Sequence, residues 1–127
     1  MFHKMKISKT YIKRIDSDYK SQVEIKYDGS KSDLLFISNE LGNSNWSGID
    51  LLDSFIKLRD FIENEGFLIL VNGARKNSWP SGFLRDSSNG LLTYIYDKEE
   101  KETFNILDFY DSDIVTYKEQ LQLYNDW

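Results

Sequence analysis

Histidine and cysteine, which often serve as catalytic bases and nucleophiles, are nearly absent from this chain of 127 residues. It has one histidine, His3, beside the amino terminus, and it has no cysteine. A general base must be held in place beside its substrate, and a residue so near a chain end is rarely fixed. Ser81 stands in Trp-Pro-Ser-Gly, not in the Gly-x-Ser-x-Gly pattern of a nucleophile elbow, and no well-placed histidine could activate it. The sequence therefore predicts a protein that is not an enzyme.

Three carboxylates, Asp108, Asp111 and Asp113, have a spacing that could ligate a hard cation such as Ca²⁺ or Mg²⁺. The same residues stand where a last helix is expected to begin, and the helix dipole favours acidic groups there. Asp86 to Gly90 resembles an ion-binding loop, but a turn before a strand accounts for the same residues. No Gly-rich phosphate motif is present. We therefore predict no metal site and no cofactor.

The net charge of −5 is unevenly distributed along the chain. Residues 1–31 hold eight Lys or Arg against four Asp or Glu, and residues 32–96 hold five against eight. Residues 97–127 hold three against nine, which makes the last part the most acidic. Phosphate contacts dominate nucleic-acid affinity, so this balance disfavours general nucleic-acid binding and suits a basic partner. The alternative is that the acidic charge serves solubility alone.

The segment from Phe67 to Asp86 is the most distinctive stretch. Its five apolar residues, Phe67 to Val71, predict a strand that is buried on both faces. A long loop without regular pattern follows, from Asn72 to about Gly90, and its aromatic residues indicate that it is ordered. The loop carries three basic residues and one indole, namely Arg75, Lys76, Trp79 and Arg85.

Two interpretations of this loop compete. In the first, which we favour, the loop is architectural: Gly73 and Gly82 allow unusual backbone angles, and Arg75 or Arg85 finds acceptors within the fold. In the second, the loop from Arg75 to Arg85 binds a ligand or a single-stranded nucleic acid, and Trp79 stacks on a base.

The amino-terminal part is expected to form a three-stranded meander. Lys6 to Ile15 alternates imperfectly and predicts a half-buried edge strand with Ile7, Tyr11 and Ile15 on one side. Ser21 to Tyr27 alternates regularly and predicts that Val23, Ile25 and Tyr27 point inward. Asp28-Gly29 is a hairpin signal that leads to a returning strand over Asp33 to Ser38.

Helical patterns and a second hairpin complete the expected fold. An apolar stripe over 47–65 predicts a helix capped by Ser47 and ended by Gly66. Strands over 91–96 and 103–109 flank a charged turn at 97–102, and helical spacing resumes after Asp113. We predict a single α+β domain over 1–127. It has a largely antiparallel sheet of about six strands, one long helix on a face and a carboxyl-terminal helix. No signal-peptide pattern is present, which predicts a cytoplasmic protein.

The stretch Asn72-Gly-Ala-Arg-Lys-Asn-Ser-Trp-Pro-Ser-Gly-Phe-Leu-Arg-Asp86, followed by Tyr94-Ile-Tyr96, resembles a group of small bacterial proteins. The likeness covers residues 67–127 and includes a Gln-containing last helix, with Gln120 or Gln122, that closes on Trp127. The chain departs from the pattern at Phe83, where Met is usual, and in having Ser-Ser-Asn-Gly in place of a Gly-rich run. We associate this group with immunity proteins of polymorphic and contact-dependent growth inhibition toxin systems.

The resemblance implies a non-enzymatic protein that binds a cognate basic toxin, such as a nuclease, and occludes its active site. Its partner would be that toxin domain, with no membrane and no direct contact with nucleic acid. Carboxylates would take the place of phosphates in the toxin's site, and opposite charge would speed association. The toxin-binding candidates lie in the acidic last part: Glu99, Glu100, Glu102, Asp108, Asp111 and Asp113.

Overall fold

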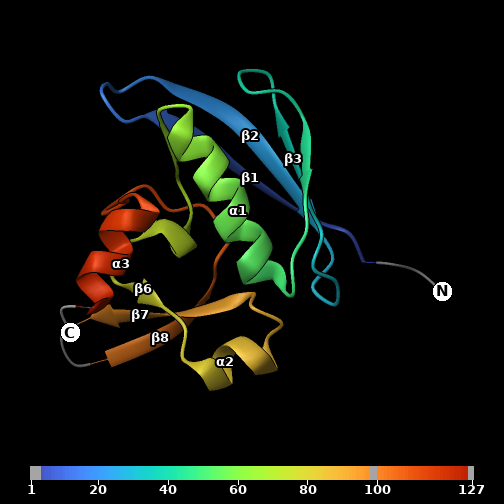
Figure 1. Cartoon of the computed structure of the whole chain (residues 1–127), viewed down its shortest axis with the longest axis vertical. Helices are drawn as coiled ribbons and strands as arrows, with labels where there is room; N and C mark the ends of the chain where they lie inside the picture. The colour runs from blue at the N-terminus through green and yellow to red at the C-terminus, as the bar shows by residue number, and fades with distance from the viewer. Residues whose placement is uncertain (1–3, 98–99, 126–127) are drawn as a thin grey trace.

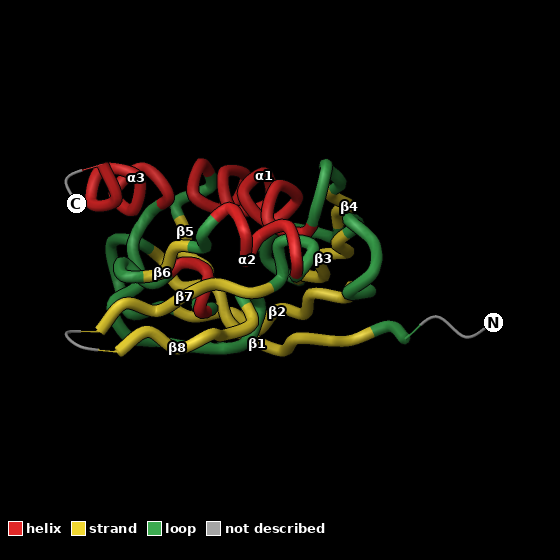
Figure 2. The backbone as a smooth tube through the Cα atoms, turned by 90° about the horizontal axis from the view of Figure 1, so that it is seen from below, coloured by secondary structure: helices red, strands yellow, loops and turns green. Residues whose placement is uncertain are grey.

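Two antiparallel sheets and three α-helices form the fold in the computed structural model, which describes residues 4–97 and 100–125 (Figure 1). The prediction of a single α+β domain with largely antiparallel strands is confirmed. The strands are divided between a five-stranded sheet and a three-stranded sheet. Figure 2 shows α1 (Leu51–Asn64) and α3 (Tyr117–Asn125) together on one side of the strands.

The larger sheet has the strand order β4-β3-β2-β1-β5, and each neighbouring pair is antiparallel. The expected meander forms its centre, with Val23, Ile25 and Tyr27 buried as predicted. The short β4 was not predicted, because its three residues lie in a polar connector. The strands are β1 (Lys6–Arg14), β2 (Lys20–Tyr27), β3 (Leu34–Ser38), β4 (Ser44–Trp46) and β5 (Phe67–Ile69).

Helix α1 covers one face of this sheet, and the hydrophobic core lies between them (Figure 1). The helix contributes Phe55, Leu58 and Ile62, and the sheet contributes residues such as Ile25 and Phe36. These side chains are almost completely removed from water. Burial of such a side chain stabilises the fold by about 1.5–3 kcal/mol.

The position of β1 differs from the prediction. It lies between β2 and β5, not at an edge. The buried face of β1 carries Ser8, Thr10 and Ile12, whereas Ile7 is 51% exposed on the other face. Two small hydroxyl residues are tolerated inside because Ser8 Oγ donates to the Leu107 carbonyl and Thr10 Oγ1 donates to the Leu70 carbonyl.

The segment after β5 has regular structure where a long loop was expected. It contains η1 (Asn72–Ala74), β6 (Ser78–Trp79) and α2 (Gly82–Ser87). Strand β6 pairs with β7 (Leu92–Asp97), which forms the predicted hairpin with β8 (Glu100–Asn105). The segment was predicted to be an ordered loop without helices or strands, and the second part of that prediction was wrong because these elements are too short to produce a periodic pattern.

Both long helices begin later than expected. Asp50, not Ser47, caps α1: its carboxylate accepts the Asp53 N–H at 2.8 Å. Thr116 caps α3 in exchange with Glu119, each side chain accepting the other residue's N–H. Asp111 and Asp113 therefore precede α3 and do not form its first turn. The prediction for the end of α1 is correct, since Gly66 has φ +87°.

Candidate functional site

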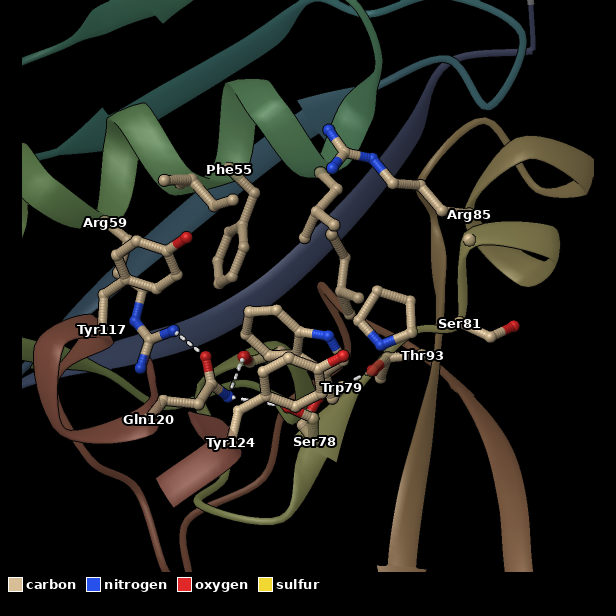
Figure 3. A pocket seen from close by; sticks show the side chains of 16 residues that line it. Phe55, Arg59, Ser78, Trp79, Ser81, Arg85, Thr93, Tyr117, Gln120 and Tyr124 are labelled. Atoms are coloured by element: carbon tan, nitrogen blue, oxygen red, sulfur yellow. Dashed lines mark hydrogen bonds between the residues drawn. The ribbon is translucent and has the colours of Figure 1, made fainter. Parts of the chain in front are cut away.

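The 72–86 segment forms one wall of a pocket of about 280 Å³ (Figure 3). The other walls come from α1, from β7 with Ile106, and from α3. Trp79 and Tyr124 line it with stacked rings whose centroids are 4.1 Å apart. The segment that the sequence singled out thus meets three elements that are distant in the chain.

Gln120 of α3 lines the pocket and is only 4% exposed. Its amide nitrogen lies 3.0 Å from the Gly73 carbonyl, 2.7 Å from that of Arg75 and 3.1 Å from that of Ser78. These carbonyls belong to η1, β6 and the turn between them. The Gln120 side chain therefore holds the backbone of residues 73–78 against α3.

Arg59 links α1 to the same network and is 1% exposed. Its guanidinium donates to Gln120 Oε1 at 2.7 Å, to the Val115 carbonyl at 2.6 Å and to Glu63 Oε2 at 2.8 Å. Burial lowers the pKa of Arg59 and raises the pKa of Glu63. The hydrogen bonds and the opposite charge of the partner act against this effect of burial on both groups. Arg59 lies within the stretch 47–65 that predicted the long helix, and no pattern in the sequence indicated this role.

Gly73 is required for close packing, not for an unusual backbone angle. A Cβ atom there would lie 2.8 Å from Phe55 Cε2 and 3.0 Å from Ile106 Cβ. Neither Gly73 nor Gly82 has a positive φ, so the prediction of unusual angles at these two glycines was wrong. Space at Gly82 is open, with no atom within 4 Å of a built Cβ.

The basic residues of the segment have partners inside the fold. Arg85 Nε lies 2.7 Å from Asp50 Oδ2, and its Nη2 lies 3.1 Å from Asp50 Oδ1. Arg75 lies over the Tyr110 ring, 3.6 Å from its centroid, and Lys76 is 3.6 Å from the Asp113 carboxylate. These contacts agree with the architectural interpretation of the loop.

The ion pair of Arg85 and Asp50 joins α2 to the cap of α1. Burial raises the pKa of the Asp50 carboxyl, but hydrogen bonds from Arg85 and from the Asp53 N–H outweigh burial and leave that pKa below its ordinary value. The same pairing raises the pKa of Arg85. Asp50 therefore caps the helix and positions the pocket's rim in its ionised form.

The acidic candidates occupy a different part of the molecule. Glu102, Asp108 and Asp111 are exposed, and Asp113 pairs with Lys76. In the part of the chain that the structure describes, no ion pair involves the first three. Glu99 lies outside the described residues, as does His3, and Glu100 belongs to β8.

Phe109 stands between Asp108 and Asp111 in the sequence, and the sequence patterns did not single it out. Its side chain is 45% exposed and meets the Tyr11 ring edge-on, with centroids 5.9 Å apart. An isolated antiparallel bridge pairs Phe109 with Val71, just after β5. The only signal in the sequence was an aromatic residue within an acidic run.

Within 4–97 and 100–125, no group of three or more His, Cys, Asp or Glu could hold a metal ion. No helix in those ranges is long and apolar enough to cross a membrane.

Comparison with known proteins adds no relative. No protein-family model matches the sequence, and a search of curated proteins gives no match either. The resemblance of residues 67–127 to immunity proteins stays a prediction from the residues themselves.

Proposed function

We propose that this protein is a non-enzymatic inhibitor that binds a cognate basic toxin domain, such as a nuclease, and covers its active site. The proposal agrees with the resemblance of residues 67–127 and with the acidic last part of the chain. The observation that carries it is that Glu102, Asp108 and Asp111 are exposed and have no ion pair among the described residues, while the exposed Phe109 lies in the same stretch of the chain.

These exposed residues have the two properties that a tight inhibitor needs. Glu102, Asp108 and Asp111 are exposed and unpaired among the described residues, so a basic partner can pair with them without breaking internal contacts. Phe109 offers apolar area that a partner's pocket can bury, as aromatic hot spots do. Opposite charge then speeds encounter, and burial of the ring slows dissociation.

The alternative function, nucleic-acid binding by the Arg75–Arg85 loop, has weaker support. The guanidinium of Arg85 is paired with Asp50, and that of Arg75 lies on Tyr110. Trp79 already stacks on Tyr124. A phosphate would compete with Asp50 for Arg85, and a base that stacked on this face of Trp79 would have to displace Tyr124.

The test is a growth assay in which this gene is co-expressed with the toxin domain encoded beside it. Protection of the cells supports the proposal, and the purified pair should associate with a rate constant that falls as salt rises. Failure to protect, with the protein soluble and folded, contradicts the proposal.

A further inference from the structure

Three hydrogen-bond donors on the wall of the pocket are not used by the fold. They are the Tyr117 hydroxyl, the indole N–H of Trp79 and the Nη1 group of Arg85. Among the residues that the structure describes, none of the three has a hydrogen-bond acceptor. All three residues line the pocket, and Figure 3 shows them placed around it. A ligand that enters would therefore meet donors that have no acceptor within the fold and are open to solvent.

The acceptors near the pocket, by contrast, are already occupied. Both carboxylate oxygens of Asp50 accept bonds from Arg85, and both of Glu63 accept bonds, from Arg59 and from the Tyr117 N–H. Gln120 Oε1 accepts from Arg59. The pocket thus offers donors and keeps its acceptors engaged, which selects for a ligand rich in acceptors.

The Tyr117 hydroxyl is subject to burial and to charges of both signs. Burial raises the pKa of the Tyr117 hydroxyl, the positive charges of Arg59 and Arg85 lower it, and the negative charge of Asp53 raises it. Each of these guanidinium groups is itself paired with a carboxylate, Arg59 with Glu63 and Arg85 with Asp50. Hydrogen-bond donors, and not a net positive charge, therefore set the preference of the pocket for a ligand that carries acceptors.

The wall formed by α1 is apolar. Leu52, Phe55 and Ile56 line it, opposite the Trp79 ring. With a volume of about 280 Å³, the pocket has room for one small molecule and not for a folded segment of a partner.

We propose that this pocket binds a small carboxylic acid with an apolar body. The carboxylate accepts hydrogen bonds from the donors that the fold leaves open, chiefly Tyr117 and Trp79. The apolar body packs against Leu52, Phe55 and Ile56. This site shares no residue with the proposed toxin-binding residues Glu102, Asp108, Phe109 and Asp111. It does not depend on the proposed inhibitor function.

Phenylacetate is a suitable probe, and benzylamine is its counterpart of similar shape and opposite charge. Isothermal titration of the full chain with millimolar phenylacetate should give saturable binding at one site, and benzylamine should give none. Tyr117→Phe removes only the hydroxyl oxygen, and Trp79→Phe removes the N–H while keeping a ring for Tyr124. Each variant should weaken phenylacetate binding about ten-fold, as expected for one lost hydrogen bond to a charged group.

Tyr11→Phe is the matched control, because Tyr11 lies on the opposite face of the larger sheet from α1. It should bind phenylacetate as the unchanged protein does. Melting temperatures identify any variant that fails to fold, and the other pocket variant then carries the test. Three results would overturn the proposal: no saturable phenylacetate binding, equal binding of benzylamine, or equal effects of Tyr117→Phe and Tyr11→Phe.

Discussion

The Arg59 guanidinium donates to Gln120 Oε1 at 2.7 Å, and this contact joins α1 to α3 across 61 positions of the chain. Gln120 in turn donates to backbone carbonyls of the 72–86 segment. The pair is buried, so each partner depends on the other for hydrogen bonding. Two side chains outside the 72–86 segment, Arg59 and Gln120, thus hold it in place.

Gln120→Ala should destabilise the protein by roughly 2–4 kcal/mol, because it leaves Arg59 Nη1 and several buried carbonyls without partners. Denaturant unfolding of the variant measures this loss. Lys118→Ala, at an exposed position of the same helix, is the control and should change stability by about 0.5 kcal/mol or less. Equal stability of the two variants would show that the network does not support the fold.

Gly73→Ala should cost roughly 1–3 kcal/mol, because its Cβ would press on the Phe55 ring and on Ile106. Gly82→Ala places the same methyl group in open space at the start of α2, where alanine favours the helix. It should leave the melting temperature unchanged or raise it. If the melting temperature of Gly73→Ala is no lower than that of Gly82→Ala, η1 does not lie as close to α1 as the structure shows.

Asp50→Asn should keep the helix cap, since asparagine is a good capping residue, but lose the ion pair with Arg85. The expected cost at neutral pH is roughly 1 kcal/mol, because Arg85 is partly exposed. The folded-state pKa of Asp50 is lowered, so its stabilisation is complete above the unfolded pKa, which is about 3.9. That stabilisation is lost as the pH falls through the folded value.

The stability difference between the unchanged protein and Asp50→Asn should therefore shrink as the pH falls below about 4. Chemical unfolding measured across this pH range tests it. Asp60→Asn alters an exposed carboxylate of the same helix and serves as the control. A stability gap that stays constant down to the lowest pH would argue against an ionised pair.

Asp108→Lys and Asp111→Lys should slow association with the toxin domain several-fold at low salt, with little effect at high salt. Both side chains are exposed, so the melting temperature should stay within a few degrees of that of the unchanged protein. Stopped-flow association kinetics measure the effect. Asp60→Lys introduces the same charge change on α1, and an equal effect from it would mean that only net charge matters.

Several elements follow from the sequence because their signals are local. Alternation over Ser21 to Tyr27 identified the buried side of β2, and Gly66 identified the end of α1. The apolar stripe of 47–65 predicted the long helix that covers the sheet. Each of these patterns depends on which residues lie next to one another on a strand or helix, and a single sequence contains that information.

The start of α1 could not be located in this way. Ser47 and Asp50 are both good capping residues, and the sequence does not say which one is used. The ion pair with Arg85, 35 positions away, holds Asp50 at the cap. The orientation of β1 was decided similarly, because the buried hydroxyls of Ser8 and Thr10 need carbonyls from distant segments.

The sequence by itself determined the fold class, the centre of the larger sheet, the long helix, and the importance of residues 72–86. Only the tertiary structure decided what those residues do: they form the wall of a pocket, they are fixed by Gln120, and they need Gly73 so that Phe55 can approach. The physical reason is that periodicity reports which face of an element is buried. The partners of a buried polar group, and the room beside a glycine, depend on segments that meet only when the chain folds.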